Sequence, residues 1–150
     1  MNLEDLTLLK KKWKEFVNSG FQADDEWNEN SLDSLLEAAE ATKGRYGEIW
    51  WEWMQTNHPE LLKYSKNSTH YLILHHEINL RSEVEYRELF TRYMIEQKAG
   101  TYSEQSEKAS RKAEEQVLQQ IVYRIPPELD IINHCKTPED FRKLPELLHY

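Results

Sequence analysis

Apolar residues recur at three- and four-residue steps along most of the chain, which is the spacing of amphipathic α-helices. A first helix is predicted from about Leu3 to Asn18. Its apolar stripe consists of Leu6, Leu9, Trp13, Phe16 and Val17. Gly20 stands where a helix commonly ends. Residues 21–30 are polar and acidic without periodicity, so they predict a loop.

The next apolar stripe follows Ser31, a favourable N-cap residue, and continues to Trp53. Gly44 and Gly47 lie inside this stripe, where each glycine costs roughly 1 kcal/mol relative to alanine in a helix. Two interpretations stay open. Either a neighbouring helix crosses closely at the glycines, or the segment is two helices with a kink. A short turn is expected over residues 60–66.

Residues 67–99 fit a long helix by spacing, although the run HYLILHH within them could by itself form a strand. Ser82 and Glu85 form a capping-box pattern, which predicts a break near Asn79–Arg81. We favour two helices, or one bent helix, because the chain offers no second convincing strand with which the first could pair.

The last third of the chain predicts three further helices. One covers residues 103–123, with a highly charged and solvated first half, and the Pro-Pro pair at 126–127 ends it. A short turn of helix follows over 128–135. A threonine and a proline at 137–138 begin the last helix, which Pro145 bends or divides.

Composition agrees with a helical fold in one domain. Four glycines and five prolines are too few for the turns of a strand-rich protein, and 150 residues is the size of one ordinary domain. We therefore predict an all-α fold over 1–150, a compact bundle of about five to seven helices with more than half of its residues helical.

The net charge of −8 is unevenly spread. Residues 1–60 contain 6 Lys/Arg against 13 Asp/Glu, whereas residues 61–150 contain 13 against 14. Nucleic acid and anionic membranes both attract clustered cations, so this acidic chain predicts neither as its ligand. The charge would instead attract a protein partner with a basic surface.

Cysteine content and the first residues indicate a cytoplasmic protein. Cys135 is the only cysteine, which excludes an internal disulfide. The first residues contain no apolar run of signal-peptide length. No segment approaches the roughly 20 apolar residues of a membrane span.

Four histidines raise the possibility of a metal site. His58, His70, His75 and His76 are imidazole ligands of the kind that suit zinc or iron. Ligands on one helix need steps of three or four residues, and His70 and His75 are five apart. We therefore expect polar or half-buried histidines on a helix surface, with no metal and no other cofactor. The alternative, a metal-binding bundle, requires them to converge on carboxylates.

Catalytic motifs are absent from the sequence. No nucleophile elbow, P-loop or dinucleotide-binding glycine pattern occurs. His134 precedes Cys135, but neighbouring helical residues point about 100° apart and do not form a nucleophile–base pair by themselves. These observations favour a non-enzymatic protein with no catalytic residues.

The run Trp50-Trp51-Glu52-Trp53 is the most unusual local feature. On a helix Trp50 and Trp53 share a face, so we expect both in the core and Trp51 at the boundary or exposed. An exposed tryptophan beside acids is typical of a protein-binding hot spot. The alternative is that Trp51 and the loop residue Trp27 pack against the protein's own helices. The predicted partner-binding residues are Asp24, Asp25, Glu26, Trp27, Glu48, Trp51 and Glu52.

Three functional hypotheses follow. The favoured one is a non-catalytic interaction module, of inhibitor, immunity or adaptor type, that binds a basic protein through an acidic, tryptophan-bearing surface. The second is a small helical subunit of a larger assembly, including a nucleoprotein assembly, which a basic strip on the folded surface would favour. The third is the metal-binding bundle.

Overall fold

The structure is a computed structural model that describes residues 1–21, 31–62, 69–96 and 104–150. Within these ranges all regular secondary structure is helical, which confirms the predicted all-α bundle. The α-helices are α1 (Leu3–Asn18), α2 (Leu32–Ala41), α3 (Arg45–Asn57), α4 (Thr69–Glu96), α5 (Glu104–Val117), α6 (Glu128–His134) and α7 (Pro138–Leu147). A 3₁₀-helix, η1 (Pro59–Leu62), and a π-helix, η3 (Leu118–Val122), complete the described elements. None of these helices is long and apolar enough to cross a membrane.

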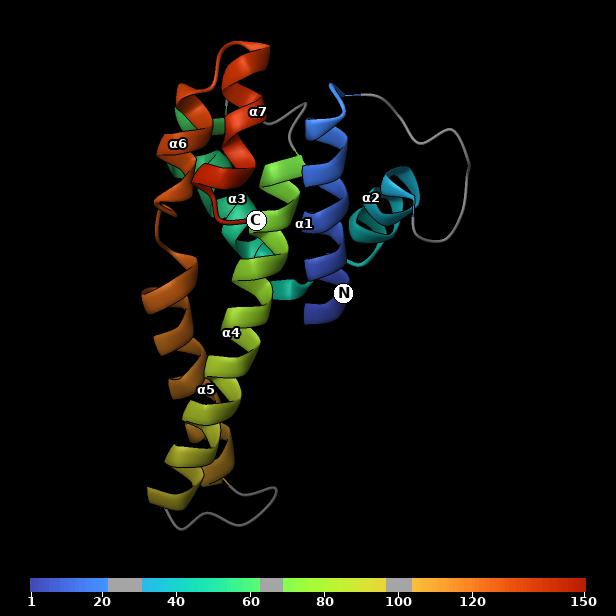
Figure 1. The fold of residues 1–150 in the computed structure, drawn as a ribbon. Helices are drawn as coiled ribbons and strands as arrows, with labels where there is room; N and C mark the ends of the chain where they lie inside the picture. Colours follow the sequence, from blue (N-terminus) through green and yellow to red (C-terminus); the bar gives the residue numbers. More distant parts are fainter. Residues whose placement is uncertain (22–30, 63–68, 97–103) are drawn as a thin grey trace.

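The long helix α4 is the centre of the fold. In Figure 1 its first half lies among α1, α3 and the α6–α7 pair, and its second half extends away from them beside α5. Every residue from Thr69 to His76 is buried. A helix covered on all sides has no wet face, which explains why the run HYLILHH shows no helical period.

α4 continues without interruption through Asn79–Arg81, so the predicted break there is wrong. Ser82 and Glu85 match a capping box in sequence, yet Ser82 lies fully buried inside the helix. α3 and α5 make the most extensive helix–helix contacts in the described structure, and both make them with α4. These tertiary contacts keep α4 continuous where the local sequence would permit a new start.

The stripe from residue 31 to 53 forms two separate helices, and its glycines also mark a close crossing, so both interpretations of this segment hold. α2 ends at Ala41, and Gly44 is the N-cap of α3. A Cβ atom on Gly47 would lie 2.6 Å from the backbone oxygen of His75, and one on Gly44 would overlap the side chain of Asn79. Only glycine allows α3 to approach α4 this closely.

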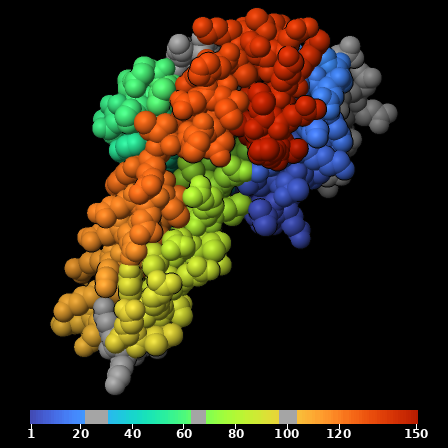
Figure 2. Space-filling view, turned by 60° about the vertical axis from the view of Figure 1, so that its left-hand side comes forward, coloured from blue at the N-terminus to red at the C-terminus, as the bar shows by residue number. Residues whose placement is uncertain are grey.

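The second half of α4 and the whole of α5, residues 83–96 and 104–117, form a two-helix arm that projects from the remainder of the molecule (Figures 1 and 2). Leu89 and Tyr93 of α4 are buried in the same cluster as Ala109 and Ala113 of α5. The small alanine side chains allow the two backbones to pack closely. The first half of α5 is otherwise solvated, as its charged sequence predicts.

Capping boxes begin both the first and the last α-helix. α1 has the predicted bounds, and Asn2 accepts a hydrogen bond from the backbone of Asp5. Thr137 and Asp140 cap each other's backbone at the start of α7. Pro145 lies inside α7 and does not divide it.

Candidate functional site

The outer face of α3 carries the two predicted partner-binding acids that the structure describes. Glu48 and Glu52 are one helical turn apart, and both are exposed. Within the described part of the chain, neither carboxylate forms an ion pair. Arg45, at the start of the same helix, is engaged with Glu114 of α5 instead. Among the described residues, the negative charge on this face of α3 is therefore uncompensated.

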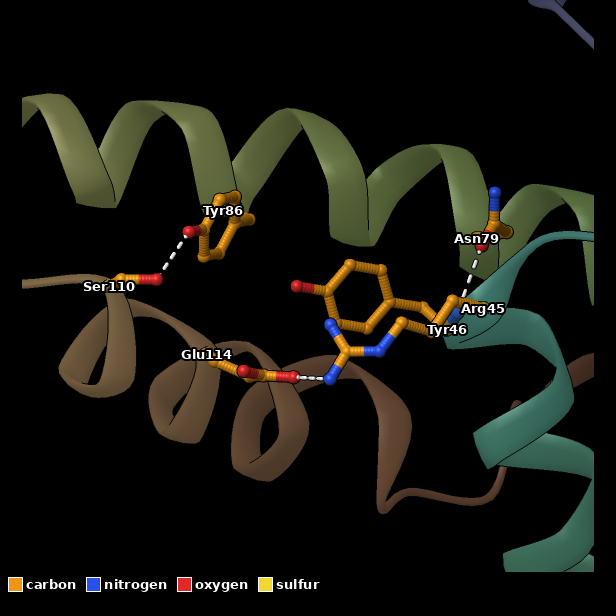
Figure 3. Close-up of polar contacts among 6 residues, drawn as sticks. All are labelled: Arg45, Tyr46, Asn79, Tyr86, Ser110 and Glu114. Carbon is orange, nitrogen blue, oxygen red and sulfur yellow. Dashed lines mark hydrogen bonds and ion pairs between the residues drawn. The ribbon is translucent and has the colours of Figure 1, made fainter. Parts of the chain in front are cut away.

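The orientation of α3 is fixed by Asn79 of α4. The Oδ1 atom of Asn79 accepts hydrogen bonds from the backbone N–H groups of Tyr46 at 3.0 Å and Gly47 at 3.3 Å. These are the second and third residues of α3, the donors that an N-cap side chain ordinarily satisfies. The N-cap residue Gly44 has no side chain that could accept these hydrogen bonds, so Asn79 of the neighbouring helix α4 caps α3 in its place (Figure 3).

The same junction connects α3 to the arm. Figure 3 shows the ring of Tyr46 between α4 and α5, with Arg45 reaching Glu114 across the gap. Nearby, the hydroxyls of Tyr86 and Ser110 are hydrogen-bonded at 2.7 Å. Burial, followed by the charge of Glu114, raises the pKa of Tyr46, so its hydroxyl stays protonated. These contacts hold α3 in place on its inner side and leave its acidic side outward.

Trp50 and Trp51 divide between core and boundary as predicted. Trp50 is completely buried and meets the ring of His75 edge-on at 6.2 Å. Trp51 is half-buried, with its ring centroid 6.0 Å from that of Tyr71 and 6.3 Å from that of His75. Trp51 therefore has one side packed against α4 and retains an exposed part on the flank of α3 beside the acids.

A surface aromatic cluster of Trp53, His58 and Tyr123 lies at the other flank of α3, and the sequence analysis missed it. Trp53 was predicted to be in the core, but it is only half-buried. Its ring centroid lies 5.1 Å from that of His58 and 6.0 Å from that of Tyr123. Tyr123 is 42% exposed, and Ile125, two residues on, is 40% exposed. No local sequence signal connects Trp53 to a residue so far along the chain.

The aromatic cluster adjoins the π-helix η3. The backbone N–H of Tyr123 donates to the carbonyl of Leu118 at 2.7 Å, closing the wide turn that sets the position of Tyr123. Single π-helical turns are rare and occur frequently at functional sites. The described α3 surface thus comprises Glu48 and Glu52 between Trp51 on one flank and the aromatic cluster on the other.

Four of the predicted partner-binding residues, Asp24, Asp25, Glu26 and Trp27, lie outside the described residues. Their assignment stays a prediction. The structure thus places three of the seven predicted residues, and it brings those three, Glu48, Trp51 and Glu52, onto consecutive turns of one helix.

The histidines of α4 are core residues, so their predicted place on a helix surface is wrong. His70, His75 and His76 are 1%, 3% and 1% exposed. Nε2 of His70 accepts a hydrogen bond from the indole N–H of Trp13 at 2.8 Å, and Nε2 of His76 lies 3.0 Å from the carbonyl of Ala39. Burial lowers the pKa of His70 to about 3 and that of His75 to about 4. All three are neutral at physiological pH and serve as packing residues.

The described residues form neither a metal-binding site nor a reactive-thiol site. No group of three His, Cys, Asp or Glu side chains there is placed to hold a metal ion. Cys135 is buried, its Sγ lies 3.4 Å from the carbonyl oxygen of Ile131, and burial raises its pKa. The neighbouring His134 directs Nδ1 to the carbonyl of Asp130. Cys135 is therefore a protonated core thiol.

Comparison of this chain with models of known protein families, with curated proteins and with solved structures finds no match.

Proposed function

We propose that this protein is a non-catalytic helical interaction module that binds a protein partner with a basic surface through the outer face of α3. The observation that carries the proposal is the pair of exposed carboxylates of Glu48 and Glu52, which form no ion pair with any residue that the structure describes and lie between half-buried aromatic side chains.

The charge of this face supports a basic protein over nucleic acid. Carboxylates repel a phosphate backbone, whereas they accelerate association with a cationic surface. The basic run of α1, which would be the natural alternative contact, is partly neutralised, since Lys10 pairs with Glu77 and Lys12 with Glu15 at 3.6 Å.

The aromatic side chains would stabilise the complex after the acids have attracted the partner. Tryptophan and tyrosine are enriched among the few interface residues that contribute most of the binding energy. The rings of Trp53 and Tyr123 are already in contact at the surface, in a tilted arrangement, so a partner that covers them would restrict their side chains less than it would restrict isolated ones. Residues 24–27 lie outside the described residues and stay part of the proposed partner-binding set.

The test is affinity capture from the native host with a charge variant of α3 and a matched control. The test variant is Glu48→Gln with Glu52→Lys; glutamine is chosen at 48 because a lysine in the first turn would oppose the helix dipole. The control is Glu37→Gln with Glu115→Lys, which changes the net charge equally at exposed acids of α2 and α5 that have no ion pair within the described ranges. A true partner is retained by the wild type and the control and lost by the α3 variant.

Two outcomes contradict the proposal. One is a specific partner retained equally by all three proteins. The other is a partner lost from both charge variants, which would indicate attraction to net charge and not to α3. Circular dichroism of each variant shows beforehand that the helices are intact.

A further inference from the structure

A hollow of about 590 Å³ lies where the end of α1, the start of α4 and the α6–α7 pair meet. Figure 1 shows these elements at one end of the molecule, and α1 packs against both α4 and α7. The walls of the hollow are mainly apolar, formed by Trp13, Phe16, Phe21, Ile132, Pro138 and Phe141. Sites for small organic molecules typically have roughly 300–1,000 Å³ of volume and a lining of this kind.

The aromatic side chains at the end of α1 form one wall of the hollow, the α1 wall. The ring centroids of Trp13 and Phe16 lie 5.5 Å apart, and Phe21 meets these two rings edge-on at 6.4 Å and 5.7 Å respectively. Phe21 has a left-handed backbone with a φ of 64°, which is a strained conformation for a bulky residue. Its backbone N–H donates to the carbonyl of Phe16 at 3.0 Å. Backbone strain of this kind occurs preferentially at ligand sites and switch regions.

The hollow is also lined by a buried polar side chain whose hydrogen bonding is incomplete. His70 is 1% exposed, and its Nε2 accepts a hydrogen bond from the indole N–H of Trp13. An indole N–H can only donate, so the neutral imidazole carries its own proton on Nδ1. This Nδ1–H has no hydrogen-bond partner among the described residues. Since an unsatisfied buried donor costs free energy, His70 favours a ligand with acceptor oxygens over a pure hydrocarbon.

The rim of the hollow is cationic. Among the described residues that line it, Lys136 alone is charged at neutral pH. The guanidinium of Arg142 is close by, since a Cβ atom on Gly20 would lie 3.9 Å from its Nη2 atom. Within the described ranges neither cation forms an ion pair, and the carboxylate of Asp140 accepts backbone N–H groups at the α6–α7 turn instead. The rim therefore attracts an anionic group.

We propose that this hollow binds a small aromatic carboxylic acid, with its ring against the α1 wall and its carboxylate near Lys136 and Arg142. The volume and the apolar walls select a small molecule with an aromatic body, and the rim selects an anion among such molecules. The described lining includes no residue of α3. Failure of this proposal therefore leaves the function proposed for α3 intact, and the reverse also holds.

Titration of the full chain with three probes that share one bicyclic ring tests the proposal. The anion 2-naphthoate is compared with the neutral 2-naphthamide and the cation 2-naphthylmethylammonium at one pH. The indole N–H signal of Trp13 in a proton–nitrogen correlation spectrum, assigned with Trp13→Phe, reports binding at the α1 wall. The anion should shift this signal with a Kd below about 1 mM, and the amide should bind at least about fivefold more weakly. An anion that leaves the Trp13 signal unmoved, or that binds no better than the amide, overturns the proposal.

A charge variant tests the rim. Lys136→Gln with Arg142→Gln should weaken 2-naphthoate about tenfold and leave the amide within about twofold, because only the anion loses its countercharges. The matched control is Arg87→Gln with Lys108→Gln, which removes the same charge from exposed positions of the arm and should leave both affinities unchanged. Equal weakening of 2-naphthoate in the two variants would show a response to net charge and contradict the assigned rim.

A truncation tests the α1 wall. Phe16→Ala should weaken the anion and the amide alike, by about tenfold or more, because both probes lose the same apolar contact. Phe90→Ala, at a half-buried aromatic residue of the arm, is the control and should leave binding unchanged. Circular dichroism checks the fold of each variant, and Phe141→Ala makes the same test from α7 if Phe16→Ala does not fold. Undiminished binding to a folded wall variant contradicts the proposal.

Discussion

Replacing Gly47 with alanine tests how closely α3 and α4 cross. In an isolated helix the change would be favourable by roughly 1 kcal/mol, because alanine is a better helix former than glycine. In this fold the added Cβ would lie 2.6 Å from the backbone oxygen of His75 and 2.8 Å from its Cε1 atom. A backbone oxygen cannot rotate aside, so the two helices must separate by nearly 1 Å.

The expected net effect follows from these two opposing terms. Overpacking of a close-packed interior costs typically 1–3 kcal/mol, and the gain in helix propensity offsets about 1 kcal/mol of this. We therefore expect the free energy of unfolding to fall by up to about 2 kcal/mol and Tm to fall by up to about 8 °C for a chain of this size. Urea unfolding followed by circular dichroism measures the first quantity, and a thermal scan measures the second.

A second substitution separates the two sources of the clash. His75→Ala in the Gly47→Ala background removes the imidazole contact and leaves the contact with the backbone oxygen. The two substitutions should therefore be coupled, with the double variant losing less stability than the sum of the single losses. If Gly47→Ala is more stable than the wild type, the close crossing of α3 and α4 is refuted.

Three further predictions concern the interior. Asn79→Ala should lower stability by about 1–2 kcal/mol in chemical unfolding because α3 loses its cap, whereas Glu83→Gln, which leaves the cap in place, should change it little. His70 and His75 have folded-state pKa values of about 3 and about 4, below the unfolded value near 6.5. As pH decreases, these histidines are protonated in the unfolded chain at a higher pH than in the folded protein. Their contribution to the free energy of unfolding is therefore fully present above about pH 6.5 and falls on the order of 1 kcal/mol per pH unit for each histidine as pH decreases towards 4. Equal stability at pH 7 and pH 5 would contradict their burial as neutral groups. Cys135 should react with a thiol reagent only after unfolding, and rapid modification of the native protein would show that it is accessible.

Local sequence predicted the elements whose signals are local. The bounds of α1 follow from its periodic apolar stripe, and α7 begins at the cap and proline that the sequence offers. The separation of α2 from α3 was anticipated as one of two interpretations of Gly44 and Gly47, and the close crossing was the other.

The errors arose where distant parts of the chain decide the outcome. Ser82 and Glu85 could begin a helix, but α3 and α5 pack against this region and α4 passes through it. The histidines of α4 were placed on a surface because imidazole is polar, yet the surrounding helices cover that stretch completely. Their neutrality is a consequence of that burial and cannot be derived from spacing.

The candidate site was predicted in part for the same reason. Glu48, Trp51 and Glu52 could be assigned together because they lie on consecutive turns of one predicted helix. The aromatic cluster could not, since Trp53 and Tyr123 are brought together by the packing of η3 on α3. Periodicity assigned Trp53 to the core because it shares a face with Trp50, and it did not reveal that this face ends at the surface.

The central claim is that the acids of α3 attract a basic partner and that the aromatic side chains retain it. The most direct measurement is the association and dissociation rates of the captured partner with the wild type, with Glu48→Gln/Glu52→Lys and with Trp53→Ala, at several salt concentrations. The account predicts that the charge variant associates more slowly with a shallower salt dependence, while Trp53→Ala dissociates faster, at a cost of about 2 kcal/mol or more if Trp53 is a hot spot. Rates that are unchanged in both variants would show that the outer face of α3 is not where the partner binds.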